Sequence, residues 1–518
     1  MKPIRLIAGI FTVGVWTLAS RILGVVREIM ILTLIGPGPV MDAFVAAFRL
    51  PNMFRRFFAE GAFNAAFVPM FSKKYEGDED PMAFAQNAMN GLALVLLALT
   101  GLALVFMPAF VWATAGGFAA DTRFDLTVGY GRVIFPYIVF ISLAALFSGA
   151  LNATGRFAAA AAAPVFLNIF VIVSMSLAAW LGGSVITWLV WTVPVAGIAQ
   201  LALVWIAADR AGIRLRPARP RLTSDLKHLT MIAIPAALAG GVMQINLLVG
   251  QQVASHFDKA VSWLYAADRL YQLPLGVVGI AVGIVLLPDL SRRLKAEDHN
   301  GGRAAFSRAG ELSLALTIPA AVALVVIPLP IVAVLFERGQ TTAADSAAIA
   351  FAVAIYGLGL PAFVLQKVLQ PVFFAREDTR TPFRYAVWAM LVNAALAIGL
   401  APVLGWYAPA IATSAAAWIM VWLLAGGARK LGDVARFDAR FRARLIRICA
   451  ASAAMGAALL AAAWALGPAL VMAGWRVPAL VLLLAVGILS YGIAGQVLGA
   501  FSMQELRAAF RRGRNGTP

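Results

Sequence analysis

Eight basic side chains lie inside apolar stretches that are long enough to cross a membrane. An Arg or Lys at the centre of a membrane helix costs roughly 2.5–3.5 kcal/mol on insertion scales, so such residues usually face a partner or a water-filled cavity. Four carboxylates lie comparably deep, and they leave a surplus of four positive charges. The basic residues are Arg21, Arg27, Arg49, Arg55, Arg56, Arg132, Arg269 and Lys367, and the acids are Glu28, Asp42, Glu60 and Asp268.

This surplus of positive charge predicts a cavity that binds an anion. Arg suits phosphate because its planar fork donates two parallel hydrogen bonds. The alternative is that long basic side chains extend from helix ends toward lipid headgroups, which fits Arg49, Arg132 and Lys367 as well as a cavity does. It fits Arg55, Arg56 and the two arginines of the first stretch less well, because these lie in the middle of their stretches.

The elements that carry these residues are predicted to be membrane-spanning helices. Hydrophobic residues make up 62% of the 518 residues and charged residues 13%, against about 25% charged in a typical soluble chain. A ~30 Å hydrocarbon core takes about 20 residues to cross, so we expect an all-α polytopic membrane protein with fourteen transmembrane helices. The expected spans are 6–35, 40–71, 83–113, 127–151, 158–181, 185–207, 229–254, 261–290, 309–335, 346–374, 383–402, 407–426, 446–466 and 477–500.

The first span also has some features of a signal peptide. Lys2 and Arg5 precede an apolar run that reaches small residues at 17–20, as a cleavable signal would. Arg21 follows at once, however, and hydrophobicity resumes as far as Ile35. We therefore expect one long helix interrupted by charge rather than a cleaved signal.

The loops between the spans differ in charge. Thirty of the 42 Lys and Arg residues lie at the termini or in even-numbered loops, and four lie in odd-numbered loops. Because cytoplasmic loops of membrane proteins carry the excess of basic residues, this asymmetry places both termini in the cytoplasm and supports an even number of spans. The four residues on the opposite side are Arg123, Lys259, Arg338 and Arg476.

Two short motifs recur at nearly the same offset along the chain. Residues 46–50 (AAFRL) are similar to 266–270 (AADRL), and residues 69–74 are similar to 288–293. These segments fall on the second and eighth predicted spans, so the repeating unit is six helices, and two six-helix lobes around a central cavity are a known transporter plan. The expected divisions are an N-terminal lobe at 1–210, a C-terminal lobe at 211–428, two further helices at 429–502 and a cytoplasmic tail at 503–518.

Other function classes leave weaker signals. The net charge of +18 would suggest nucleic acid in a soluble domain, but here it is mostly loop bias, so no nucleic-acid partner is expected. The single cysteine, Cys449, and three scattered histidines give neither a disulfide nor a metal site. Asp78, Glu79 and Asp80 fit the D-x-D metal motif of glycosyltransferases, although three acids in a short loop are more often a solvated turn. We expect a protein that is not an enzyme and has no cofactor.

Polar and glycine residues in the first two spans form a pattern that continues in two later segments. It resembles the MurJ (MviN) family of bacterial lipid II flippases, which belongs to the multidrug/oligosaccharidyl-lipid/polysaccharide exporter superfamily, and it covers essentially the whole chain. The matching segments are 20–28 (SRILGVVRE), Gly36, 42–44 (DAF), 48–56 (FRLPNMFRR), 59–63 (AEGAF), 66–69 (AFVP), 263–270 (WLYAADRL) and 376–382 (REDTRTP).

The resemblance implies a fold and a function. Two six-helix lobes would enclose a cationic cavity, and the last two helices would add a groove for a polyprenyl tail. The chain would move lipid II, a disaccharide peptide on undecaprenyl pyrophosphate, from the cytoplasmic to the periplasmic leaflet by alternating access for cell wall synthesis. Its partners would be lipid II and membrane lipids. We expect a monomer in the bacterial inner membrane that can contact cell-wall synthesis proteins.

The resemblance also assigns roles to residues. Arg21, Arg27 and Arg269 match cavity arginines that the family needs, and we expect Arg27 and Arg269, one from each lobe, to clamp the pyrophosphate. The acid after Arg27 is usually aspartate in the family and is Glu28 here, which keeps the charge but adds a methylene. The full set of expected substrate-binding residues is Arg21, Arg27, Arg55, Arg56 and Arg269, and the expected cavity or gating carboxylates are Glu28, Asp42, Glu60 and Asp268.

Some members of the family use sodium, bound by carboxylates on helices 7 and 11. Here span 229–254 contains no Asp or Glu, and span 383–402 offers Asn393 instead of an acid. We therefore expect no sodium site of that type and no bound metal.

Three questions stay open. An exporter of another undecaprenyl-pyrophosphate-linked oligosaccharide would select the same arginines, whereas an antiporter for cationic drugs would show an excess of acid in its cavity. A membrane glycosyltransferase is the alternative from another class. The basic segment 427–447 either binds anionic lipid as an amphipathic surface helix or follows the cytoplasmic bias of basic residues alone.

Overall fold

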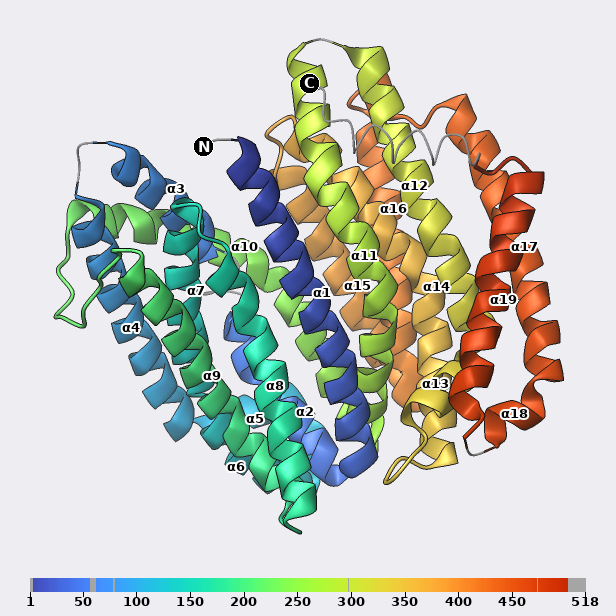
Figure 1. The fold of residues 1–518 in the computed structure, drawn as a ribbon, viewed down its shortest axis with the longest axis horizontal. Coiled ribbons are helices and arrows are strands. Elements are labelled where there is room, and N and C mark those ends of the chain that lie inside the picture. Colours follow the sequence, from blue (N-terminus) through green and yellow to red (C-terminus); the bar gives the residue numbers. More distant parts are fainter. Residues whose placement is uncertain (1–2, 56–61, 78–79, 297, 473, 502–518) are drawn as a thin grey trace. The chain divides into compact units, whose positions relative to one another are not determined.

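The computed structural model describes residues 3–55, 62–77, 80–296, 298–472 and 474–501. Every regular element within these ranges is a helix (Figure 1). Nine helical segments of this described part are long and apolar enough to cross a membrane. This confirms the expected all-α membrane class, while the count of fourteen spans stays a prediction.

Contacts divide the chain into two compact units. The N-terminal unit comprises Met1–Ser262 together with Arg338–Thr341, and the C-terminal unit comprises Trp263–Glu337 and Thr342–Pro518. The helix over Ser224–Ala254 packs in the N-terminal unit. The boundary between the two compact units thus lies after Ser262, whereas the sequence predicts the boundary between the two lobes after residue 210.

The N-terminal unit begins with one long helix, as expected for the first span. The expected spans 83–113 and 127–151 are each formed by two helices, and Pro108 and Pro136 mark the divisions. Proline has no N–H to donate, so it is tolerated where a helix begins. The elements are α1 (Pro3–Leu34), α2 (Pro39–Arg55), α3 (Ala62–Glu76), α4 (Pro81–Val105), α5 (Met107–Ala115), η2 (Gly116–Ala120), α6 (Thr122–Ile134), α7 (Tyr137–Ala153), α8 (Ala158–Trp180), α9 (Val185–Arg210), α10 (Ser224–Ala254) and the start of α11 (Ala260–Lys295).

Aromatic side chains fill much of the core of the N-terminal unit. The ring of Phe67 stacks on those of Phe71 and Phe84 with centroids 5.6 and 5.7 Å apart, and all three are buried. Phe147 on α7 stacks on Trp205 of α9 at 5.1 Å. Aromatic pairs at this spacing add about 0.5–1.5 kcal/mol beyond the burial of their area. They hold α3, α4, α7 and α9 as one body, on which α8 and α1 pack in turn.

The C-terminal unit contains the remaining helices. Within it α12, α14, α15 and α16 form one packed group, and α17 packs on both α12 and α19. Its elements are most of α11, then α12 (His299–Val326), α13 (Pro328–Phe336), α14 (Ala343–Phe374), α15 (Arg380–Leu404), η3 (Gly405–Tyr407), α16 (Ala408–Arg429), η4 (Asp433–Ala435), α17 (Ala439–Ala465), α18 (Gly467–Val471) and α19 (Arg476–Val497).

The end of α1 is bound by the short segment 338–341. The backbone N–H of Gln340 donates to the carbonyl of Thr33 (2.9 Å), and the Thr341 hydroxyl donates to the carbonyl of Leu32 (2.7 Å). Gly339 has a φ of +60°, and a Cβ there would lie 2.1 Å from the Thr33 carbonyl oxygen. Glycine is therefore required at this position, and the segment satisfies carbonyls that the end of a helix leaves unpaired.

The basic segment 427–447 forms the end of α16, a short connection and the first turns of α17. In the connection, Phe437 stacks on Phe306 of α12 with ring centroids 4.6 Å apart. The buried carboxylate of Glu311 accepts from Arg308 (2.7 Å) and from Arg444 of α17 (3.3 Å). The segment is thus the start of a long apolar helix bound to α12, which favours the cytoplasmic bias over a separate surface helix.

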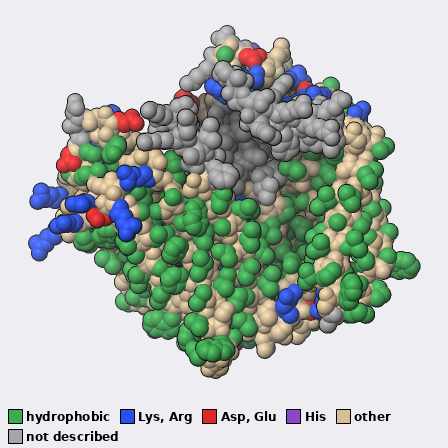
Figure 2. Space-filling view, in the orientation of Figure 1, with side chains coloured by type: hydrophobic (Ala, Val, Ile, Leu, Met, Phe, Trp, Pro, Cys, Tyr) green, Lys and Arg blue, Asp and Glu red, His purple; other side chains and the backbone are tan. Residues whose placement is uncertain are grey.

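Hydrophobic side chains cover much of the face that Figure 2 displays, and the largest group of Lys and Arg lies at its upper left. Exposed apolar residues are frequent on the long helices, including Trp180 (80%), Trp464 (86%) and Val497 (79%). Water-soluble proteins do not expose apolar surface of this extent. The exposed residues are therefore those that contact lipid.

Candidate anion-binding site

Arg27 is the best-defined cation among the predicted site residues. It lies on α1 with its side chain 14% exposed. Its Nη2 donates to Glu28 Oε1 (2.6 Å), and its Nη1 donates to Asn168 Oδ1 on α8 (2.9 Å). Its Nε is buried and has no hydrogen-bond partner within the described ranges. A guanidinium carries five N–H donors, so these two contacts orient the group and leave most of its donors for a ligand.

Asn168 also binds the backbone of α1. Its Nδ2 donates to the Ser20 carbonyl (2.9 Å) and more weakly to the Ser20 hydroxyl (3.4 Å). One amide therefore connects two turns of α1 with α8. Its role was not predicted from the sequence, where the available signal was a lone amide in an apolar span, since polar residues at such positions are usually functional.

The other predicted arginines of the N-terminal unit have different surroundings. Arg21 is half-buried on α1, but six residues turn a helix by roughly 600°, so it points away from the Arg27 side. Arg55 Nε donates to Asn52 Oδ1 (3.2 Å) at the end of α2. Arg56 and Glu60, which the sequence also assigned to the cavity, lie outside the described residues.

The C-terminal unit holds the second predicted cation, Arg269, on α11. Its guanidinium carbon lies 4.6 Å from the centroid of the Tyr265 ring, and its Nη2 donates to the Tyr265 hydroxyl (3.1 Å). The neighbouring Asp268 accepts from Gln272, one turn further along the helix. Tyr265 therefore orients Arg269 while Gln272 holds the adjacent acid.

Asp42, predicted as a cavity or gating carboxylate, lies in a buried network of the N-terminal unit. Its Oδ1 accepts from the Ser262 backbone N–H (2.8 Å) and hydroxyl (2.5 Å), and its Oδ2 pairs with Arg123 (3.4 Å). Arg123 also pairs with Asp121 (2.6 Å) and Asp258 (3.5 Å). Asp42 thus contacts Arg123 rather than one of the predicted cavity arginines.

Arg123 is a residue whose role the sequence did not reveal. From the sequence it was counted as one of four cations in odd-numbered loops. In the structure it is 5% exposed, and its contacts connect α2, α6 and the turn before α11. Its guanidinium lies 4.5 Å from the centroid of the Phe118 ring. The hydrogen bond from Arg123 lowers the pKa of Asp121, which lies just before α6. These contacts satisfy the guanidinium on several sides, as expected of a group that holds segments together.

The remaining in-span cations, Arg132 and Lys367, are exposed side chains. Arg132 donates to the carbonyl of Leu104 (3.3 Å). Arg49 is half-buried and makes a long contact with the Leu247 carbonyl (3.5 Å). The exposure of the first two agrees with basic side chains that extend toward headgroups.

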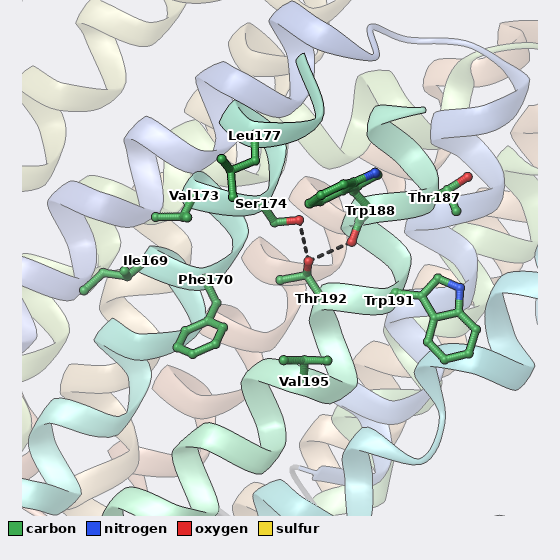
Figure 3. Close-up of a pocket in the computed structure, with 10 residues that line it drawn as sticks. All are labelled: Ile169, Phe170, Val173, Ser174, Leu177, Thr187, Trp188, Trp191, Thr192 and Val195. Carbon is green, nitrogen blue, oxygen red and sulfur yellow. Dashed lines mark hydrogen bonds between the residues drawn. The ribbon is translucent and has the colours of Figure 1, made fainter. Parts of the chain in front are cut away.

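An apolar groove of about 570 Å³ lies between α8 and α9. Figure 3 shows its lining, with Ser174 and Thr192 in hydrogen-bond contact (2.5 Å) and the Thr192 hydroxyl donating to the Trp188 carbonyl (2.7 Å). The lining residues include no charged side chain, so a pyrophosphate would find no partner there. The groove suits hydrocarbon instead.

No cluster of three or more His, Cys, Asp or Glu occurs among the residues that the structure describes. On α10 the polar residues serve packing, because Gln251 donates to the Thr114 carbonyl (3.2 Å) and Gln252 accepts from the Gly116 N–H (2.8 Å). Asp80 of the D-x-D sequence accepts from the N–H groups of Met82 and Ala83 and so caps α4. Asp78 and Glu79 lie outside the described part of the chain.

Long apolar helices with exposed apolar side chains define a multi-pass membrane protein, and each unit holds a partly buried arginine that its neighbours orient. The family model of the lipid II flippase MurJ matches residues 31–486. A probable lipid II flippase MurJ of Rhizobium tropici is 48% identical over 421 residues, which cover 80% of this chain and 79% of that protein. The chain belongs to the lipid II flippase MurJ family.

Solved structures agree with this assignment. The structure of a lipid II flippase MurJ in an inward closed conformation matches with a TM-score of 0.79 at 25% identity, covering 94% of this chain and 98% of that one. An inward-facing multidrug resistance MATE family transporter of the MOP superfamily shares the fold, with a TM-score of 0.65 at 15% identity and coverage of 80% and 95%. The expected membership in the lipid II flippase family is confirmed, and the chain is a multi-pass protein of the bacterial inner membrane.

Proposed function

We propose that this chain translocates lipid II from the cytoplasmic to the periplasmic leaflet for peptidoglycan synthesis. Arg27 carries the proposal, because its partly buried guanidinium is oriented by one carboxylate and one neutral amide. A group held in this way presents positive charge and free N–H donors to a phosphate. The disaccharide peptide of lipid II cannot cross hydrocarbon unaided, so a protein that shields the pyrophosphate is required.

Arg269 is the second proposed ligand of the pyrophosphate. Tyr265 orients its guanidinium by stacking and by a hydrogen bond, so the ligand meets a group whose conformation is already restricted. Arg27 and Arg269 are each proposed to donate to one phosphate, for which the planar guanidinium is suited. Arg21, Arg55 and Arg56 are proposed to add positive charge around them, with Glu28, Asp42, Glu60 and Asp268 as the pairing or gating acids.

We propose that translocation follows alternating access in a fold of fourteen spans. Two six-helix lobes would enclose the headgroup, α17 and α19 would guide the prenyl tail, and both termini would face the cytoplasm. Moving about two negative charges outward across an inside-negative membrane gains roughly 2.3 kcal/mol per charge per 100 mV. The potential can therefore contribute to the driving force.

The proposed topology has a direct test. Cys449 is the single cysteine, so its replacement by serine gives a background for new cysteines at Asp78 and Arg338. An impermeant thiol reagent added to intact cells should label a cysteine at 338 and not one at 78. Labelling at 78 alone would show that the orientation is the reverse of the one proposed.

Two alternatives give different outcomes. An exporter of another undecaprenyl-pyrophosphate-linked glycan would fail to replace an essential lipid II flippase, although it would need the same arginines. A membrane glycosyltransferase would lose sugar-transfer activity on Asp78→Ala. The use of Asp80 as a helix cap supports a structural role for that acid, and we propose a transporter without a covalent step.

We also propose that the monomer is the working unit and that cell-wall synthesis proteins are accessory partners. The N-terminal unit already contains every described contact that orients Arg27. Reconstitution at one copy per vesicle should therefore retain transport, and transport that appears only with two or more copies would contradict the monomer.

The test of the proposed function is replacement in cells. With this chain as the sole lipid II flippase, the wild type should support growth, whereas Arg27→Ala and Arg269→Ala should stop lipid II translocation while remaining inserted and abundant. Arg132→Ala is the matched control, because that arginine is exposed. Normal translocation by both the Arg27 and Arg269 variants would overturn the proposed pyrophosphate site.

A further inference from the structure

Asn168 stands out on α8 because it is 5% exposed within an otherwise apolar stretch. Burying an amide without hydrogen bonds is unfavourable. Both ends of this amide are satisfied by α1, through Arg27 on one side and Ser20 on the other. The residue therefore belongs to the surroundings of Arg27 rather than to the general packing of α8.

The chemistry of the partners fixes which way the amide points. A guanidinium only donates hydrogen bonds and a backbone carbonyl only accepts them. The oxygen of Asn168 must then face Arg27 Nη1 (2.9 Å), and its NH₂ must face the Ser20 carbonyl (2.9 Å). The reversed amide would place donor against donor and acceptor against acceptor, so the arrangement has one orientation.

The surface of α1 leaves room for the Asn168 side chain to lie against it. Ser20, Gly24 and Arg27 recur at helical spacing, so they lie on one side of α1. A Cβ at Gly24 would meet Asn168 Nδ2 at 4.0 Å, which is ordinary contact. The amide therefore lies directly over the turn between its two partners, where it holds the Arg27 side chain against the helix.

The two groups that hold Arg27 differ in charge. Glu28 contributes a negative charge at 2.6 Å, which offsets part of the field of the guanidinium. Asn168 orients the other nitrogen without any charge. A second carboxylate in its place would hold the guanidinium equally well but would cancel the attraction for an anion.

We propose that Asn168 is a positioning residue for lipid II transport, which fixes the Arg27 guanidinium toward the pyrophosphate while preserving its positive charge. This inference rests on the proposed function, because it assigns the pyrophosphate to Arg27. Asn168 itself acts through Arg27 and needs no contact with the substrate.

The test is a double-mutant cycle on lipid II affinity, measured by titrating lipid II into the purified full chain in lipid nanodiscs. Asn168→Ala should weaken binding about ten-fold, in the range of coupling for residues in contact. In the Arg27→Ala background the same substitution should have no further effect. Asn168→Asp should weaken binding at least as much, because it adds a second negative charge beside Arg27 and replaces the donor to the Ser20 carbonyl with an acceptor.

Ser174→Ala is the matched control, since Ser174 is a buried polar residue of the same helix that bonds Thr192 in the groove of Figure 3. It should bind lipid II like the wild type. Asn168→Gln, which keeps an amide oxygen, should recover part of the affinity and serves if the alanine variant does not fold.

Two results would overturn the positioning role. One is an Asn168→Ala affinity equal to that of Ser174→Ala, and the other is an Asn168→Ala effect of equal size with and without Arg27. Both leave the proposed function intact if Arg27→Ala alone still weakens binding. Wild-type affinity in Arg27→Ala would instead contradict the pyrophosphate site and the positioning role together.

Discussion

Arg123 is a buried and Arg27 a partly buried arginine of the N-terminal unit, and their partners differ in charge. Arg123 pairs with three carboxylates, Asp42, Asp121 and Asp258. Arg27 pairs with one carboxylate and with the neutral amide of Asn168. The first guanidinium is overcompensated by acids, whereas the second keeps a positive field that an anion can use.

This difference separates two uses of a buried cation. A guanidinium surrounded by acids from several segments holds those segments together, and loss of one partner leaves an uncompensated charge. A guanidinium held by one acid and one neutral amide is oriented while less of its positive charge is offset. The charges of the partners therefore distinguish the two arginines, and they favour Arg27 as the proposed ligand of the pyrophosphate.

The largest expected effect concerns transport by Arg27→Ala. Truncating one partner of a buried, hydrogen-bonded charge pair costs about 2–5 kcal/mol, so lipid II transport should fall on the order of a hundred-fold or more. Thermal stability should fall less than in Arg123→Ala, because the described contacts of Arg27 connect only α1 and α8, whereas those of Arg123 connect α2, α6 and the turn before α11. The measurement is lipid II translocation together with the unfolding temperature of the same preparation. A large fall in stability with normal transport would place Arg27 with the structural arginines.

Arg123→Ala should give the opposite pattern. Removing it leaves Asp42 buried without its counter-charge, and breaking a buried ion pair costs about 3–5 kcal/mol. We expect a marked loss of stability in a denaturation experiment, while lipid II affinity per folded molecule stays close to that of the wild type. Weakened lipid II binding without loss of stability would contradict the structural role of Arg123 and place it with Arg27.

A smaller effect is expected from Asp42→Asn. The amide oxygen can still accept from Ser262, but the NH₂ group then faces the donors of Arg123. An unsatisfied buried donor costs about 1–3 kcal/mol, and Arg123 retains Asp121 and Asp258. The check is the free energy of unfolding relative to the wild type. A loss of stability as large as that of Arg123→Ala would mean that Arg123 stabilises the unit mainly through Asp42.

Ser262→Ala should have the smallest effect. It removes one hydroxyl from Asp42, which keeps the Ser262 backbone N–H (2.8 Å) and Arg123. A typical hydrogen bond contributes about 0.5–1.5 kcal/mol, and we expect a loss in that range by thermal unfolding. No change would show that the backbone contact alone satisfies this oxygen.

Much of the fold could be predicted because hydrophobicity along the chain reports directly on helices in lipid. The first span appears as one helix despite Arg21 and Arg27, and the expected spans coincide with helices or helix pairs. The divisions at Phe106 and Ile327 were not predicted, because apolar sequence continues through them and local proline geometry sets the break.

The candidate site was predictable in its residue types but less so in its partners. Arg27 with Glu28, and Arg269 on a later helix, followed from charge inside apolar sequence. Asn168 and Arg123 did not, because their partners lie 141 and 81 residues away along the chain. Such contacts arise only when the helices pack, and a charge count by loops treats Arg123 as a surface residue.

The most direct test of the central claim is the rate of lipid II translocation in proteoliposomes that contain only this protein. The wild type and Arg123→Lys should move lipid II, since lysine keeps the charge that Asp42 faces, whereas Arg27→Ala at equal folded amount should be close to protein-free vesicles. Equal rates for the wild type and Arg27→Ala would contradict the assignment of the pyrophosphate to Arg27.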